Sequence, residues 1–352
     1  MSWLGRSGPM EHGDRKDGRF SSVERYVASH GATMMADSGS APTPPSRSRP
    51  EASVAAGPGD VNVPRADREK SRWLAFLTHD PLPIGGVAGA LVAGTSVLLG
   101  VPVDLPLIVA AICGTTLVYG ADRAIGLSPE DRINRPDRVR WVVRHRRWLA
   151  GESVLLTIVL LLVIPFLRPA TWGLGGFVAG LAVLYVAPVF PRGRRLKDFG
   201  RSKPVFVTAL WALGSVAFPA VEAGWEGETA GMLVLAGLVL YRATVIGANV
   251  LLADWGDRVG DRSAGREGAI QTLSGIEIRT AATGLLGAGG AGIAATALTI
   301  GVPALLWIDA VGILIMIAAV WTLRPGASSV HLLLLDLAVA WPVATMIADA
   351  AM

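Results

Sequence analysis

The sequence has little cysteine, histidine or charge, and each shortage excludes a class of protein. Cys113 is the single cysteine among 352 residues, so neither a disulfide within the chain nor a cysteine-based zinc site is possible. The five histidines show no spacing typical of metal ligands, and no Gly-rich phosphate loop or Gly-x-Ser-x-Gly elbow is present. Charged residues make up only 17% of the chain, 51% of residues are hydrophobic, and the mean hydropathy is +0.47. These values lie outside the usual range of soluble domains.

The net charge of +4 does not indicate a nucleic-acid-binding protein. Its basic residues fall in short connectors between apolar stretches, which is the pattern of membrane topology. We therefore expect a protein of the lipid bilayer with no nucleic-acid partner. Residues 1–68 are different, because they are rich in Gly, Ser, Pro and charge and have few bulky apolar residues. We predict that they form a disordered cytoplasmic tail without a catalytic role.

Apolar segments of about bilayer-spanning length recur from Ile84 onward, and they predict an all-α, polytopic membrane domain over residues 69–352. Several are rich in glycine and alanine, as in residues 284–295, which permits close helix packing in lipid. The nine candidate transmembrane helices cover residues 84–100, 105–120, 148–167, 172–188, 205–221, 232–253, 281–300, 304–323 and 330–350.

The connectors between these spans alternate in charge. Arginine and lysine are concentrated after the second, fourth and sixth spans. In the odd-numbered connectors Arg168 is the only basic residue, and the fifth connector is acidic. The positive-inside rule then places the N-terminus and the even-numbered connectors in the cytoplasm and the C-terminus outside. We expect the protein in the cell (cytoplasmic) membrane as a multi-pass protein.

Three carboxylates lie at the mouth of the sixth span. Asp254, Asp257 and Asp261 are three and four residues apart, which places them on one face of a helix, close enough to share a cation. Carboxylate oxygens are ligands that Mg²⁺ prefers, and Mg²⁺ usually binds substrate phosphates as well. At the edge of a bilayer this cluster suggests chemistry on a lipid diphosphate. The alternative is a set of surface ion pairs with Arg258 and Arg262, which contribute little to stability.

The connector after the second span has a similar character. Asp122 and Arg123 close that span, and further carboxylates and arginines follow, including Asp131. Four spans separate this connector from the cluster at Asp254, so both lie on the same face of the membrane. The pattern is compatible with a duplicated four-helix unit.

Three stretches resemble motifs of one family, the UbiA superfamily of intramembrane prenyltransferases. They correspond to its first aspartate motif region, the basic connector after its fourth helix, and its second aspartate motif, and the likeness covers roughly residues 70–352. In chain order they are Asp122-Arg123 with the later Asn134-Arg135-Pro136-x-Arg138, Tyr185-x-x-Pro188 with Arg194-Arg195-Leu196-Lys197, and Asp254-x-x-Asp257-x-x-Gly260-Asp261-Arg262-x-x-Gly265-Arg266.

The resemblance implies a nine-helix transferase that moves a polyprenyl group from a polyprenyl diphosphate to an aromatic or other lipophilic acceptor within the membrane. It implies Mg²⁺ as cofactor and basic residues that assist the departure of pyrophosphate. For the basic role we expect Lys197 and Arg123, with Lys203 also well placed by position. The metal ligands implied by the two acidic motifs are Asp122, Asp131, Asp254, Asp257 and Asp261.

The first motif departs from the family pattern. Val118 and Tyr119 stand where the family has Asn-Asp, so Asp122 and either Glu130 or Asp131 remain as its carboxylates. The depleted motif leaves two alternatives to an active enzyme. One is a catalytically silent, UbiA-like lipid-binding protein, and the other is a membrane transporter that uses the same carboxylates for an ion or a head group. Acidic clusters at helix ends, and not at the bilayer midplane, favour the enzyme over the transporter.

Arg242 is a third candidate catalytic residue, because it lies within an apolar helix and an ionisable intramembrane residue is a functional hypothesis by default. Asp336, inside the last span, is one hypothetical partner for it. Asn249 lies nearby and is equally explained by a hydrogen bond between helices.

Overall fold

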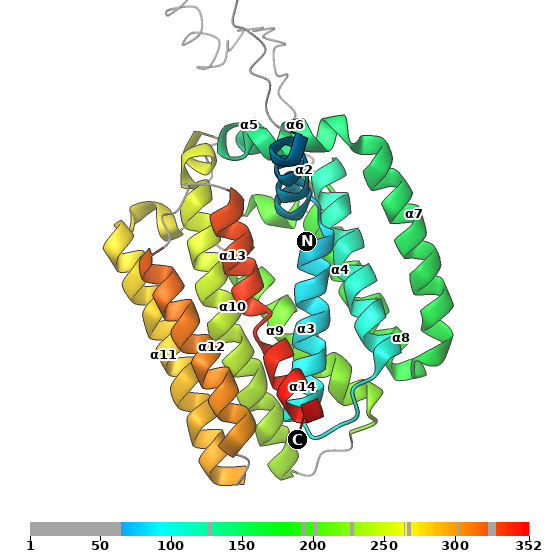
Figure 1. The fold of residues 1–352 in the computed structure, drawn as a ribbon, viewed down its shortest axis with the longest axis vertical. Helices are drawn as coiled ribbons and strands as arrows, with labels where there is room; N and C mark the ends of the chain where they lie inside the picture. The colour runs from blue at the N-terminus through cyan, green and yellow to red at the C-terminus, as the bar shows by residue number, and fades with distance from the viewer. Residues whose placement is uncertain are drawn as a thin grey trace, which may run out of the picture. The chain divides into compact units, whose positions relative to one another are not determined.

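The computed structural model describes residues 65–125, 129–191, 195–199, 203–225, 229–263, 265, 269–300, 303–322 and 329–351. The predicted tail over residues 1–68 lies outside these ranges except for its last four residues. Throughout the described ranges the chain forms helices and no β-strand, and the helices pack side by side in a bundle (Figure 1). The predicted all-α class is therefore confirmed.

Every predicted span corresponds to a helix, or to two consecutive helices, in the described residues. In chain order these are α3 (Leu82–Leu98), α4 (Leu105–Ile125), α7 (Arg146–Val163) with η2 (Ile164–Phe166), α8 (Pro169–Val186), α9 (Lys203–Glu222), α10 (Thr229–Ser263), α11 (Gly275–Ile300), α12 (Pro303–Thr322), and α13 (Ser329–Val339) with α14 (Pro342–Ala351). The remaining elements are α2 (Arg65–His79), α5 (Pro129–Asn134), α6 (Pro136–Arg144), η4 (Leu196–Asp198) and η5 (Ala269–Thr272).

Five helices in the described part of the chain are long and apolar enough to cross a membrane, namely α4, α7, α8, α9 and α10. A sixth span results if α2 and α3, which are bent by 58° at the break between them, are counted together. The ninth predicted span is not one continuous helix. Pro342 lies inside it and begins α14, because a proline lacks the N–H that would continue the helical hydrogen bonds of α13.

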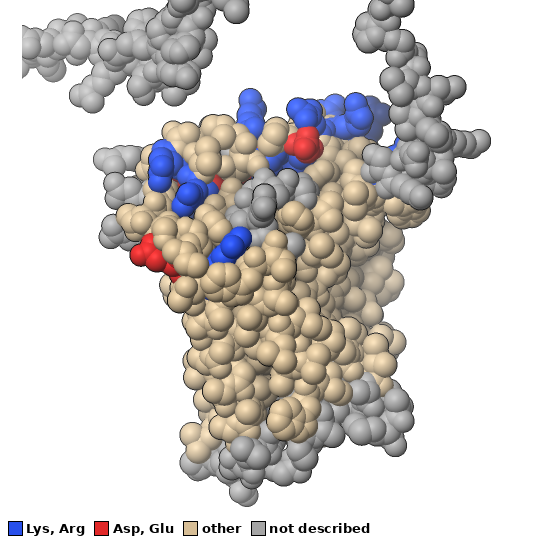
Figure 2. Space-filling model, turned by 60° about the vertical axis from the view of Figure 1, so that its left-hand side comes forward, with Lys and Arg blue, Asp and Glu red and all other residues tan. Residues whose placement is uncertain are grey.

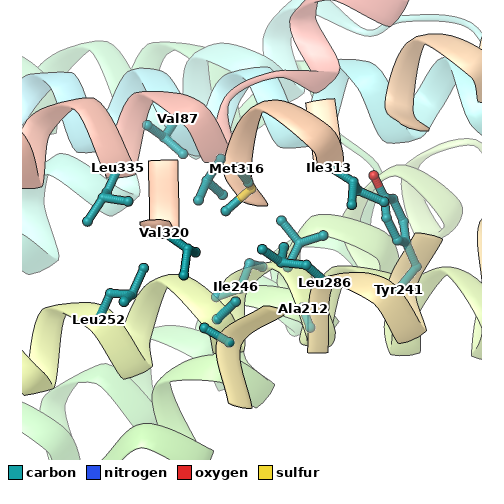
Figure 3. Packing of buried hydrophobic residues seen from close by; sticks show 14 of the residues in the cluster. Val87, Ala212, Tyr241, Ile246, Leu252, Leu286, Ile313, Met316, Val320 and Leu335 are labelled. Carbon is teal, nitrogen blue, oxygen red and sulfur yellow. The ribbon is translucent and has the colours of Figure 1, made fainter. Parts of the chain in front are cut away.

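The main core lies among α3, α10, α11, α12 and α13. Figure 3 shows side chains from these helices that point into a common space, and each is at most 5% exposed. Representatives from the five helices are Val87, Ile246, Leu286, Met316 and Leu335.

The outer faces of the helices are apolar as well. On α7, α8 and α10, respectively, Leu162, Phe177 and Leu233 are each more than 60% exposed. Large apolar side chains at such exposure are costly in water and are expected where a helix faces lipid. The lipid-facing surface therefore agrees with the polytopic prediction.

Small residues bring neighbouring helices into close contact. A Cβ atom at Gly289 of α11 would lie 2.3 Å from the hydroxyl oxygen of Thr244 on α10, so no larger residue fits there without displacement. Within the segment 284–295, for which close packing was predicted, Gly289 makes this close contact, whereas a Cβ at Gly284, Gly287 or Gly292 would meet no atom within 4 Å. The contact of Gly85 on α3 with α4 is closer still, since a Cβ there would lie 2.1 Å from the hydroxyl oxygen of Thr116.

Gly85→Ala is expected to destabilise the bundle. The new Cβ would also lie 2.7 Å from the carbonyl oxygen of Ile112, which is backbone and cannot rotate away. Overpacking of this kind costs about 1–3 kcal/mol, and the midpoint of thermal unfolding in detergent measures it. Gly86→Ala is the matched control, because a Cβ at that position meets no atom within 4 Å. Equal midpoints for the two variants would contradict the close α3–α4 contact.

Charge is concentrated at one end of the bundle. On the face drawn in Figure 2, Lys and Arg side chains gather at the upper end, and the surface below them carries almost no charged residues. Short helices α5 and α6, which form the connector after α4, lie at this end (Figure 1). The candidate site is built here, where helix ends and basic connectors meet.

Candidate site at the charged end of the bundle

Helix α10 positions the second acidic cluster. It has 35 residues, and at 1.5 Å per residue it is about 50 Å long, whereas the hydrocarbon core of a bilayer is about 30 Å thick. Its last turns therefore extend beyond the apolar part and carry Asp254, Asp257 and Asp261. The three residues follow the helical repeat and share one face of α10, as predicted.

Asn134, at the end of α5, fastens the first connector to this part of α10. Its side-chain amide donates to the backbone carbonyl of Asp257 at 2.7 Å, and its carbonyl oxygen accepts the N–H of Gly260 at 2.7 Å. A Cβ atom at Gly260 would lie 2.6 Å from the Asn134 side chain, so only glycine permits this approach. The two acidic connectors, predicted to lie on one face of the membrane, are thus in direct contact.

Asp254 and Asp257, the two carboxylates of the cluster that lie nearest the apolar part of α10, both form ion pairs. Arg135 Nη2 lies 2.7 Å from Asp257 Oδ1, and Lys203 Nζ lies 3.0 Å from Asp254 Oδ1. In each pair one side chain is largely buried, with 10% of Arg135 and 14% of Asp254 exposed, whereas 26% of Asp257 and 29% of Lys203 are exposed, so solvent screens these charges less than it screens surface pairs. Lys203 begins α9 and Arg135 follows α5, so three parts of the chain contribute to this pairing.

The first connector supplies a third pair at the end of α4. Asp122 Oδ1 lies 2.5 Å from Lys197 Nζ, and the Lys197 side chain is only 10% exposed. Lys197 is held in place by the short helix η4, in which the N–H of Arg195 donates to the carboxylate of Asp198 at 2.9 Å. The structure therefore places Lys197, for which the sequence predicts a role beside the diphosphate, in contact with Asp122 of the first acidic connector.

The elements that carry the pairs pack together. Tyr185 lies near the end of α8 and stacks on Phe206 of α9 with ring centroids 5.6 Å apart, and both α8 and α9 contact η4. Asp122, Asp254 and Asp257 with Lys197, Lys203 and Arg135 therefore form one region, called the ion-pair site below.

The other predicted residues lie around or away from this site. Asp131 pairs with Arg138 at 2.6 Å, in the same connector as Arg135. Asp261 continues the α10 face one turn beyond Asp257 and is partly buried. Arg123 donates to the backbone carbonyl of His79, and it forms no ion pair within 4.0 Å among the described residues.

Arg242 belongs to a different cluster. It precedes Asp254 by twelve residues on α10, which corresponds to about 18 Å along the helix. Its guanidinium is buried, lies 3.9 Å from Asp309 of α12 and donates to the Thr95 hydroxyl of α3 at 3.3 Å. The hypothesis that Arg242 pairs with Asp336 is wrong.

Asp336 of α13 has a different partner. Its carboxylate accepts a hydrogen bond from the side-chain amide of Asn249 on α10, at 3.0 Å. Asn249 therefore forms the hydrogen bond between helices that was one of its two predicted explanations.

The carboxylates of the site are of the chemical type that binds a metal ion, but they are not grouped closely enough to hold one. Their oxygens are hard ligands of the type that Mg²⁺ prefers. However, no three Asp, Glu, His or Cys side chains in the described ranges are grouped closely enough to hold a metal ion. Asp122, Asp254 and Asp257 each face a lysine or arginine instead. In this arrangement the residues do not form a metal site.

Asn134 and Arg135 contact the second acidic cluster, although the sequence assigned neither of them a role. Both lie in the stretch that resembles the first motif region, and the proline that follows them marks the end of α5. Their partner residues are more than 120 positions away. A contact between residues so far apart in the sequence cannot be predicted from a local pattern, although the Asn-Arg-Pro stretch itself was recognised as part of the first motif region.

Comparisons with known proteins rest on structure alone. No family model matches the sequence, and no curated protein matches it. Among solved structures, the fold is similar to the apo structure of a UbiA homolog from Aeropyrum pernix K1, with a TM-score of 0.57 and 18% identity, over 77% of this chain and 98% of that one. A digeranylgeranylglyceryl phosphate synthase also matches, with a TM-score of 0.43 and 16% identity, over 80% of this chain and 99% of that one. Together with the helical bundle described above, the first of these likenesses shows that the chain has a UbiA-like fold.

Proposed function

We propose that the protein is a membrane prenyltransferase that moves a polyprenyl group from a polyprenyl diphosphate to a lipophilic acceptor. The observation that carries the proposal is the ion-pair site itself. Three basic side chains from η4, α9 and the α5–α6 connector converge with carboxylates at the end of apolar helices. A polyprenyl diphosphate matches this arrangement, because its diphosphate suits the basic side chains and its prenyl chain suits the apolar helices.

The basic side chains supply the electrostatic part of the reaction. When the allylic C–O bond breaks, its electron pair goes to the leaving diphosphate, and negative charge grows on the phosphate oxygens. Lys197, Lys203 and Arg135 are held by the carboxylates of the site, whose side chains are 14–36% exposed, and can donate N–H groups to those oxygens. Donors preorganised in a site of low dielectric stabilise developing charge without reorganisation.

The apolar bundle supplies the other part. The prenyl cation must be kept from water until the acceptor attacks it, forms the new bond and gives up a proton. The buried side chains between the helices of the main core are mostly aliphatic (Figure 3), and such a surface excludes water. An acceptor that partitions into the bilayer reaches this environment directly.

The cytoplasmic position of the site is part of the same proposal. Basic connectors gather at the end of the bundle that carries the ion-pair site, in agreement with the positive-inside rule (Figure 2). A polyprenyl diphosphate made in the cytoplasm would then meet the site from the side on which its head group is soluble.

Pyrophosphate release tests the proposal. Purified full-length protein in detergent is incubated with prenyl diphosphates of different lengths and a membrane extract as the source of acceptor. We expect release of pyrophosphate that depends on both components. Mg²⁺ dependence, which the family resemblance predicts, is measured in the same assay by titration after treatment with a chelator.

Two results would contradict the proposal. Binding of a prenyl diphosphate without any turnover would indicate the catalytically silent alternative. Failure to bind any prenyl diphosphate, with or without Mg²⁺, would remove the diphosphate assignment of the ion-pair site.

A further inference from the structure

A small cavity lies beside the ion-pair site, between the α2–α3 break and α13. Its volume is about 80 Å³. A water molecule occupies about 30 Å³ in the liquid, whereas pockets for whole small molecules measure roughly 300–1,000 Å³. The cavity therefore has room for a compact head group and not for a complete ligand.

The walls of the cavity are divided by polarity. Pro83 and Ile84 of α3 and Leu332 and Leu333 of α13 form an apolar part. The remaining lining is mostly polar or charged and comes from the end of α2, the α2–α3 break, the end of α4, the α5–α6 connector and Asp336 of α13. A ligand that places its head group in the polar part would lay an apolar chain along α3 and α13.

Three guanidinium groups line the polar part. Arg135 and Arg138 each direct one N–H to a carboxylate, Asp257 and Asp131 respectively, and each guanidinium has five N–H donors in all. Arg123 is the third, and its hydrogen bond goes to a neutral backbone carbonyl. A cation at the end of a membrane helix without a paired anion is costly, so an anion in the cavity would stabilise it.

His79 provides a second, independent indication of a ligand. Its side chain lines the cavity, the residue is only 8% exposed, and its Nδ1 atom has no hydrogen-bond partner within the described structure. Buried polar atoms are normally hydrogen-bonded, and leaving one without a partner costs about 1–3 kcal/mol. A head group with an oxygen atom or a hydroxyl would satisfy it.

The carboxyl groups that line the cavity are already engaged. Asp80 accepts the N–H of Leu82 at 2.9 Å and the indole N–H of Trp148 at 3.2 Å. Asp336 accepts from Asn249, as described above. The arginines therefore remain the groups available to a ligand.

We propose that this cavity binds the anionic head group of an amphiphile, a single phosphate or carboxylate on an apolar chain, next to the diphosphate site. Arg123 and His79 contact the head group, and the apolar chain lies along Leu333 of α13. Two sources share this chemistry, namely an acceptor substrate with an anionic group and an anionic lipid of the bilayer. The acceptor form rests on the proposed function, whereas binding of the head group does not.

Dodecyl phosphate is a suitable probe, measured by isothermal titration calorimetry on the full chain in an uncharged maltoside detergent. We expect saturable binding to one site and at least ten-fold weaker binding by Arg123→Gln. Arg140→Gln is the matched control, because this arginine lies on α6, is 75% exposed, pairs with Asp137 and does not line the cavity. Equal affinity of the two variants would overturn the proposal.

A second pair of variants keeps the test independent of charge. Leu333→Phe adds volume to the wall and is expected to weaken binding, whereas Leu334→Phe changes a neighbouring residue that is 49% exposed and does not line the cavity. Unchanged affinity in Leu333→Phe would place the probe elsewhere. Competitive displacement of dodecyl phosphate by pyrophosphate would also overturn the proposal, because the cavity would then belong to the diphosphate site.

Further titrations distinguish the sources. Phosphatidylglycerol that binds as tightly as dodecyl phosphate, with the same loss in Arg123→Gln, supports a bilayer lipid as the ligand. Binding of dodecyl phosphate or dodecanoate but not of phosphatidylglycerol supports a single-chain acceptor. Binding of inorganic phosphate with equal affinity would contradict the role of the apolar wall. Dodecyl phosphate binding without pyrophosphate release would leave the cavity assigned and refute only the proposed function.

Discussion

Asp257→Ala is expected to reduce pyrophosphate release by at least about 100-fold, which corresponds to about 2.7 kcal/mol of transition-state stabilisation. The substitution removes the carboxylate that lies 2.7 Å from Arg135 and leaves that largely buried guanidinium without its partner. Under the proposed function, Arg135 would then lose the orientation in which its N–H groups meet the leaving diphosphate. The measurement is the initial rate of pyrophosphate release at saturating prenyl diphosphate.

Asp137→Ala is the matched control for this loss. It removes the same charge from the neighbouring helix α6, but the Asp137 side chain is 69% exposed and pairs only with exposed Arg140 among the described residues. Exposed pairs contribute little, so the rate and the thermal midpoint should remain near those of the unsubstituted protein. Equal rates in Asp257→Ala and Asp137→Ala would exclude Asp257 from the site.

Asp309→Ala is expected to give the largest loss of stability. Asp309 and Arg242 are 0% and 1% exposed, and their charged groups lie 3.9 Å apart between α12 and α10. Removing one partner leaves an uncompensated buried charge, which costs about 3–5 kcal/mol. The midpoint of thermal unfolding in detergent, and the yield of folded protein from membranes, should both fall.

The double substitution Arg242→Leu with Asp309→Leu separates a structural role from a catalytic one. Replacing a buried ion pair by apolar residues of similar size is often neutral or stabilising, so the midpoint should recover most of the loss. If Arg242 only joins helices, the rate of pyrophosphate release recovers as well. A stable double variant without activity would support the sequence prediction that Arg242 is catalytic.

The spans were predictable from the sequence because lipid imposes a one-dimensional rule. Any helix that crosses a bilayer needs about 20 apolar residues, and that requirement is visible in hydropathy without knowledge of neighbours. The same local reasoning placed Asp254 and Asp257 on one face of α10, since the helical repeat determines it. The break at Pro342 was also a local signal, although the apolar run around it suggested a single span.

The partners of those carboxylates were a different problem. Lys203 and Arg135 meet α10 only because α9 and the α5–α6 connector pack beside it, and no local pattern encodes which helices are neighbours. The pairing of Arg242 with Asp336 was wrong for this reason. Hydropathy indicates how deep a charged residue lies, but packing decides whether α12 or α13 supplies its counter-ion.

The C-terminal helix α14 ends at the opposite end of the bundle from α5 and α6 (Figure 1). An affinity tag or fluorescent protein fused after it would therefore occupy the other aqueous compartment from the ion-pair site. Protein immobilised through such a tag would present the site to free solution, with the anchoring surface a full membrane thickness away. The same fusion would show by its accessibility to protease in intact cells which way the chain is inserted.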